Sequence, residues 1–259
     1  TVVAIDMGGL GKLNINQGDS GNGIDAFDDK MPSAWEEPWG NALGTGVKLV
    51  SGSGPNSNVM YSTPTIAGTT ITFTMAPDMG SGNVADNGYS GHGGSTGAGH
   101  DLTLNINPSL GTEILTGLNL FVGAHQTANT VATENNLYEG VAGLTLDIGP
   151  VSLGYAKAGL APGSTGAKAD VEWYKNDMYG IAFNVNDDLS ISYAKHESRQ
   201  GFHGRDVASI DMDVSSFQIA YTMGGASLRY AEIETDNAAY QTSTIYDKDA
   251  KIISVSLAF

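Results

Sequence analysis

The chain has 259 residues without cysteine, and its 28 acidic residues outnumber its 12 basic residues, giving a net charge of −16. The lack of cysteine excludes a disulfide framework and a thiolate metal site. The acidic surplus argues against binding to a nucleic-acid backbone, which requires Lys and Arg. No run of about 18 apolar residues occurs, so the sequence predicts no membrane-spanning helix. Membrane-spanning strands are not excluded, because each needs only about 9–11 residues, in which apolar and polar residues alternate.

Short segments in which apolar and polar residues alternate follow one another along the whole chain, with the period of a β-strand. Ile71, Phe73 and Met75, for example, alternate with threonines. The pattern predicts about thirteen strands, at 1–7, 10–18, 57–66, 69–77, 100–108, 113–126, 136–149, 151–159, 171–186, 189–198, 211–223, 226–235 and 246–259. The fold class is therefore all-β, although a soluble β-sandwich also alternates in this way.

The connections between the predicted strands alternate between short turns and long polar loops. Short turns are expected at 8–9, 67–68, 108–111, 149–150, 186–188 and 224–225, and long loops at 19–55, 78–99, 127–135, 160–170, 199–210 and 236–245. Short turns on one rim and long loops on the other are the plan of a transmembrane antiparallel β-barrel. A soluble sandwich has no reason to keep this alternation.

Tyrosines recur on the apolar side of the predicted strands. A repeated pattern at 151–157, 189–195 and 226–232 places one tyrosine among the apolar positions of each segment, so these tyrosines should face lipid. The tyrosines that fit an aromatic girdle at the membrane interface are Tyr61, Tyr138, Tyr155, Tyr179, Tyr193, Tyr221 and Tyr230. Aromatic side chains in the core of a soluble protein are the alternative.

The last predicted strand alternates Ile253, Val255 and Leu257 with small residues and ends at Phe259. It resembles the closing strand of bacterial outer-membrane proteins, in which the terminal aromatic residue serves as an assembly signal. We therefore expect Phe259 to have that role.

Residues 10–75 resemble the trimeric general porins of Gram-negative bacteria, especially the alphaproteobacterial ones. A strand at 13–18 ends in glycine, an acidic loop contains Met31-Pro32-Ser33-Ala34-Trp35-Glu36-Glu37, and the chain re-enters a strand at Asn58. The resemblance implies a single porin domain over 1–259, a homotrimer in contact with outer-membrane lipid and lipopolysaccharide, and a pore-constricting loop at 19–55. It also implies an outer-membrane channel for passive diffusion of ions and small hydrophilic solutes.

The position of that loop bears on the number of strands. In the resembling family the infolded loop joins strands five and six of sixteen, whereas here it joins the second and third predicted strands. We therefore expect a sixteen-stranded barrel of which about thirteen strands are present, with three strands upstream of Thr1. An open edge in lipid would leave backbone groups unpaired, at several kcal/mol each.

Charge at the constriction, together with pore width, sets the selectivity of such a channel. The expected constriction residues are Asp19, Asp25, Asp28, Asp29, Lys30, Glu36 and Glu37. The family carries arginines on the facing wall, but the matching positions here, Gln17 and Ser62, are uncharged, while Lys12 and Arg229 are expected to line the lumen. The sequence thus predicts a cation-preferring pore, unless these acids belong to a solvated surface turn.

The sequence gives few signs of metal binding or catalysis. Asp25, Asp28 and Asp29 are the best candidates for a structural calcium site, because calcium takes oxygen ligands. No other cofactor is expected. The histidines show no metal-ligand spacing. Most lie in or beside predicted long loops, so we expect them at the solvated surface; they are His92, His100, His125, His196 and His203. No catalytic arrangement of Ser, His and Asp is recognisable, so the sequence predicts no enzyme.

Two other functions stay open. One is a substrate-specific outer-membrane channel, which would need a row of aromatic or charged residues along the lumen. The predicted lumen positions carry mainly Ser, Thr, Asn, Ala and Gly, which favours weak specificity. The other is a soluble secreted β-rich binding protein or adhesin, which would purify without detergent.

Overall fold

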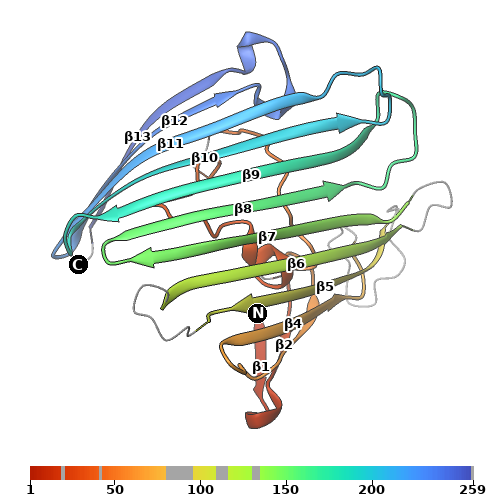
Figure 1. Ribbon diagram of the computed structural model, residues 1–259, viewed down its shortest axis with the longest axis horizontal. Helices are drawn as coiled ribbons and strands as arrows, with labels where there is room; N and C mark the ends of the chain where they lie inside the picture. The colour runs from red at the N-terminus through yellow and green to blue at the C-terminus, as the bar shows by residue number, and fades with distance from the viewer. Residues whose placement is uncertain (19–20, 41–42, 80–95, 109–115, 130–134, 258–259) are drawn as a thin grey trace.

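The computed structural model describes residues 1–18, 21–40, 43–79, 96–108, 116–129 and 135–257. Over these residues the chain forms one 13-stranded sheet in which each strand pairs with its neighbours in sequence order, and every pairing is antiparallel. Figure 1 shows the strands stacked in chain order across a curved wall. They are β1 (Val2–Asp6), β2 (Lys12–Asn16), β3 (Asn58–Ser62), β4 (Thr69–Ala76), β5 (Thr96–Ile106), β6 (Gly117–Asn129), β7 (Leu137–Ile148), β8 (Val151–Ala161), β9 (Val171–Asn184), β10 (Leu189–Phe202), β11 (Ile210–Met223), β12 (Ala226–Asp236) and β13 (Lys248–Leu257).

The number and order of the strands confirm the prediction, but several strands extend further toward the long loops. β6 continues to Asn129 and β10 to Phe202, where the sequence predicted ends at 126 and 198. The ladder hydrogen bonds continue there, although the alternation of apolar and polar residues has already faded. The short helical segments are η1 (Gly8–Leu10), η2 (Gly23–Phe27), η4 (Ala238–Tyr240) and η5 (Thr244–Tyr246). No helix among the described residues is long and apolar enough to cross a membrane.

The described connections follow the predicted alternation of short turns and long loops. Gly149 and Gly224 take positive φ values of 57° and 59° in the turns after β7 and β11, as tight hairpins require. The turn after β3 also uses positive φ values, at Ala67 and Gly68. The turn predicted at 108–111 lies largely outside the described residues.

The described sheet is an open arc, because β1 and β13 each pair with one neighbouring strand and not with each other. The apolar side chains of its outer face are exposed, as at Leu102 and Ile253, which are 57% and 70% exposed. Tyr138, Tyr179 and Tyr193 are also exposed, and they share the alternation of the outer apolar residues. On the other face lies a hydrophobic cluster built with the long connection between β2 and β3. The three additional strands of the sixteen-strand prediction stay a prediction.

Candidate functional site

The connection between β2 and β3, residues 17–57, lies against the inner face of the sheet; we call it the inner loop. Figure 1 shows it behind the strands, with η2 behind β6 and β7. Ile24, Phe27 and Met31 from the loop join a buried cluster with Phe121 and Met178 from the sheet. The rings of Phe27 and Phe121 are 5.0 Å apart. Apolar side chains placed at intervals in an otherwise acidic loop thus seat it on the wall.

Neutral polar side chains of the sheet hold the middle of the inner loop. Ser192 Oγ accepts a hydrogen bond from the Ala34 backbone N–H at 2.8 Å. Gln218 Oε1 accepts the N–H groups of Trp35 and Glu36 at 2.9 and 3.0 Å. These side chains, both buried, were predicted only as lumen-facing positions, since nothing in the sequence shows which of them the loop would cover.

Further along the inner loop, two side chains form hydrogen bonds with the backbone of Lys48. The Lys48 N–H donates to the Tyr240 hydroxyl at 3.1 Å, and Asn176 Nδ2 donates to the Lys48 carbonyl at 2.9 Å. Tyr240 comes from η4, in the long connection before β13, so the loop is tied to a segment nearly 200 residues away in the chain. Sequence patterns carry no signal for such a contact.

The predicted acidic residues of the inner loop lie near one another and are partly buried. Burial, with the charges of Asp25 and Asp29, raises the pKa of Asp28 to about 7. Burial and a hydrogen bond with Glu36 raise the pKa of Glu37 to about 8. Asp28 and Glu37 line the same small hollow. Partial burial, together with repulsion between neighbouring carboxyls, therefore makes these groups retain protons near neutral pH.

Asp25 differs from the other loop acids in its backbone contact. Its carboxylate accepts the Gly21 N–H at 2.6 Å, and burial nevertheless raises its pKa. Asp19 lies outside the described residues. The structure therefore brings five of the predicted loop acids into one region.

The predicted wall residues divide between the two faces of the sheet. Lys12 is on the same side of β2 as the buried Asn14 and Asn16, and Arg229 is on the same side of β12 as the buried Ala231, so both belong to the inner face. Gln17 follows β2 and shares the alternation of the exposed Ile15 instead.

Ser62 belongs to the inner face as well. Its hydroxyl lies 3.1 Å from Thr72 Oγ1 on β4. The roles of the wall and loop residues in a pore stay predictions, as does that of Phe259, which lies outside the described residues.

Two histidines are placed differently from the prediction. His125 on β6 and His196 on β10 are buried on the inner face, at 3% and 1% exposure. The prediction of solvated loop positions was wrong for both, because these strands are longer than expected and the inner loop covers their inner face. His196 Nε2 lies 3.0 Å from Asn176 Oδ1. His92 lies outside the described residues.

A metal site finds no support in the described part of the chain, where no three His, Asp or Glu side chains are placed to hold an ion. The carboxylate of Asp25 is turned to the Gly21 N–H. A structural calcium ion at Asp25, Asp28 and Asp29 stays a prediction.

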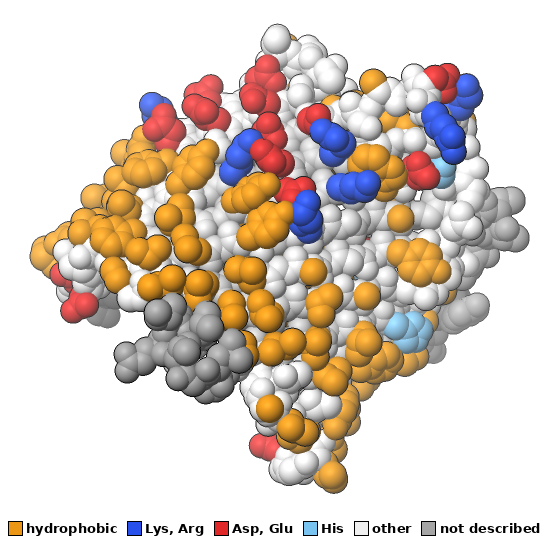
Figure 2. All heavy atoms as spheres, in the orientation of Figure 1, with side chains coloured by type: hydrophobic (Ala, Val, Ile, Leu, Met, Phe, Trp, Pro, Cys, Tyr) orange, Lys and Arg blue, Asp and Glu red, His pale blue; other side chains and the backbone are white. Residues whose placement is uncertain are grey.

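The outer face carries a second polar feature, which we call the charged band. Figure 2 shows acidic and basic side chains crossing the part of this face formed by the later strands, beside a wide apolar area. The band comprises Lys157, Lys175, Asp177, Lys195, Glu197, Arg199, Asp211 and Asp213. Its residues alternate with buried inner-face positions on β8–β11.

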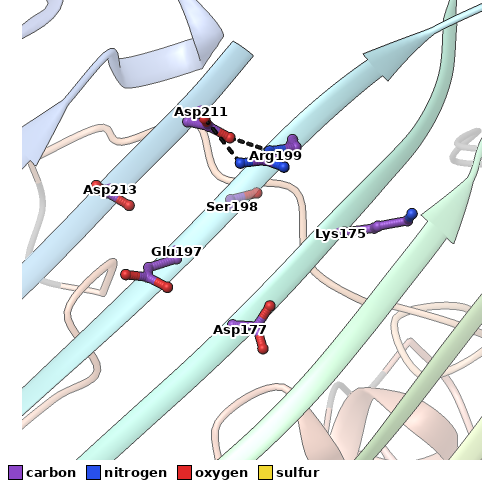
Figure 3. Close-up of a pocket in the computed structure, with 7 residues that line it drawn as sticks. All are labelled: Lys175, Asp177, Glu197, Ser198, Arg199, Asp211 and Asp213. Carbon is purple, nitrogen blue, oxygen red and sulfur yellow. Dashed lines mark hydrogen bonds and ion pairs between the residues drawn. The ribbon is translucent and has the colours of Figure 1, made fainter. Parts of the chain in front are cut away.

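Cross-strand register explains the composition of the charged band. Asp177, Glu197 and Asp213 are direct neighbours on β9, β10 and β11. Like charges opposite one another destabilise a sheet, and lysines offset this here: Lys157 lies 2.8 Å from Asp177, and Lys195 lies 2.5 Å from Glu197. Figure 3 shows Arg199 paired with Asp211 beside this carboxylate row. Such exposed pairs require a polar environment.

Solved structures resemble this chain, whereas no protein-family model and no curated protein matches it. An anion-selective porin from Comamonas acidovorans matches with a TM-score of 0.58 at 13% identity, over 88% of this chain and 64% of that one. OmpF from Salmonella typhi, in complex with daunomycin, matches with a TM-score of 0.65 at 11% identity, over 95% and 74%. The outer-membrane channel DcaP of Acinetobacter baumannii matches with a TM-score of 0.57 at 10% identity, over 95% and 70%.

The chain thus spans slightly less than two thirds of the Comamonas protein. Identities of this size establish the fold and not the activity. With its antiparallel strands, alternating rims and loop-covered inner face, the chain has the β-barrel fold of outer-membrane porins.

Proposed function

We propose that the protein is a passive diffusion channel of the bacterial outer membrane for ions and small hydrophilic solutes. The observation that carries the proposal is the acidic inner loop folded onto the inner face of a sheet whose outer face has a wide exposed apolar area. A sheet with this polarity suits a lipid environment outside and a water-filled lumen inside. Charged side chains on a loop folded into the lumen would set the selectivity of such a channel.

The outer face supports placement in a membrane. Apolar residues such as Ile181 and Phe183 occupy one part of β9 and are exposed, while Lys175 and Asp177 follow in the charged band. The Lys175 ammonium lies 4.2 Å from the ring centroid of Trp173, a pairing that suits the polar edge of a bilayer. We infer that the apolar part contacts lipid tails and the charged band contacts headgroups, lipopolysaccharide included. A homotrimer stays part of the proposal.

Cation preference is the finer part of the proposal. The fold alone does not decide it, because the solved relatives include an anion-selective porin. Support comes from the composition of the inner loop, whose described residues include two bases, Lys30 and Lys48, and five acids, Asp25, Asp28, Asp29, Glu36 and Glu37. A narrow pore with low-dielectric walls concentrates the field of such a charge imbalance.

Planar-bilayer recording tests the proposal directly. The protein, purified in detergent, should insert and give stepwise increases in conductance, with a reversal potential of the sign expected for cations under a salt gradient. Purification in buffer as a soluble monomer, or absence of conductance steps, would overturn the channel. A reversal potential of the opposite sign would overturn cation preference alone.

A further inference from the structure

One buried carboxylate joins the beginning and the end of the inner loop. Asp101 on β5 is 1% exposed, and its Oδ2 accepts the backbone N–H of Ile24 at 3.0 Å and that of Ser53 at 3.1 Å. Its Oδ1 lies 2.5 Å from His125 Nδ1. We call these two neighbouring parts of the loop, around Ile24 and around 51–53, the neck of the inner loop.

A second buried carboxylate binds the neck beside Ser53. Glu139 on β7, 8% exposed, accepts the N–H groups of Ser51 and Gly52 at 3.0 and 2.7 Å. A carboxylate buried without donors would be strongly destabilised, so the backbone N–H groups of the neck stabilise both acids. When ionised, these carboxylates accept stronger hydrogen bonds than neutral Ser192 and Gln218, which hold the middle of the loop.

Glycines make this close approach possible. Gly52 has a φ of +54°, and a Cβ at this position would lie 2.7 Å from Asp101 Oδ2. Gly23 has a φ of +63°, and a Cβ there would collide with the same carboxylate. Both positions therefore need glycine for backbone conformation and for space, so the neck is shaped to fit Asp101.

We propose that Asp101 and Glu139 are positioning residues that clamp the neck of the inner loop and thereby fix the width of the pore. The proposal rests on the channel function proposed above. Without the clamp, the neutral contacts in the middle of the loop hold it less tightly, and the loop moves within the lumen. Neither acid needs to contact a permeating solute.

Conductance of the double variant Asp101→Asn/Glu139→Gln tests the clamp. Each amide keeps one acceptor oxygen, which can still accept the N–H groups that Asp101 Oδ2 or Glu139 Oε2 accepts in the parent, but it loses the negative charge that strengthens these bonds. We expect the single open level of the parent to be replaced by fluctuating levels. The matched control is Asp147→Asn, on the inner face of β7 but bonded to Ser152, which should keep the parental level. A double variant with the parental level would overturn the clamp.

A cysteine reporter measures the loop independently of conductance. The chain has no cysteine, and Val50, next to the neck, is 1% exposed. Val50→Cys should resist a charged thiol reagent in the parent and in Asp147→Asn, and should react in the double variant. Equal protection in all three would overturn the clamp. If the parent gives no conductance, the channel proposal fails while this measurement still decides the clamp.

Gly52→Ala provides a variant that retains both carboxylates, in case the double variant does not fold. The added Cβ should displace the neck from Asp101 and make Val50→Cys reactive. A protected cysteine in this background would also overturn the clamp.

Discussion

The backbone of Pro32 lies directly on Gly180, so that a Cβ at Gly180 would be 2.9 Å from the Pro32 carbonyl oxygen. Gly154, directly opposite Gly180 on β8, meets the ring of the same proline. The paired glycines form a flat seat on the inner face, and the inner loop passes over the sheet at this point.

Adding a methyl group to this seat should shift the loop. We expect Gly180→Ala to destabilise the protein by about 1–3 kcal/mol, as overpacking typically does, and to change the single-channel conductance. The matched control is Gly159→Ala on β8, where a Cβ would meet only the Tyr174 carbonyl at 3.7 Å. Equal conductance and unfolding free energy for the two variants would contradict the seat.

Sequence alternation predicted the strands because each side chain of a strand faces either lipid or the interior, and these two environments select different residues. It could not separate inner positions that face water from those that the loop covers. The sequence pattern therefore could not predict that Asp101, His125 and Glu139 form one group. They come from three strands, and only the folded loop brings them together. The buried histidines were predicted in solvent for the same reason.

The membrane placement predicts a difference between two positions on the outer face. Ile181→Lys places a charge in the apolar part and should cost about 2–4 kcal/mol if that part lies near the middle of the bilayer. Ser215→Lys, in the outward alternation of β11 beside Asp213, should cost about 0–1 kcal/mol, as near the interface. Unfolding from lipid vesicles with denaturant measures both, and similar costs would contradict the proposed depth of the charged band.

Cation preference should increase with pH. The pKa values of Asp28 and Glu37 are about 7 and about 8, so both carboxyls lose their protons between about pH 6 and about pH 9, and the pore gains negative charge. The reversal potential in a fixed salt gradient measures this change. Asp28→Asn/Glu37→Gln should remove most of it, and an unchanged pH profile in this variant would assign the titration to other groups.

The free energy of unfolding should depend on the same two carboxyls, but it should decrease with pH, whereas cation preference increases. The folded pKa values of Asp28 and Glu37 exceed the ordinary values of 3.8 and 4.5, so the folded state binds these protons more tightly than the unfolded state. Their contribution to the free energy of unfolding is therefore largest at low pH and decreases from about pH 4 to about pH 8. Comparing denaturant midpoints of the parent and the double amide variant across this range isolates the contribution.

The loop acids should also give the selectivity its dependence on salt. Replacing Asp28, Asp29, Glu36 and Glu37 with their amides should lower the cation preference and leave the sheet intact, because none of them belongs to a strand. The effect should be clear in dilute salt and fade in concentrated salt, since the Debye length falls from about 10 Å at 0.1 M to about 3 Å at 1 M. Reversal potentials at several mean concentrations with a constant ratio measure it. A preference that the four replacements leave unchanged at low salt would show that charges elsewhere on the lumen wall, such as Lys12 and Arg229, govern permeation.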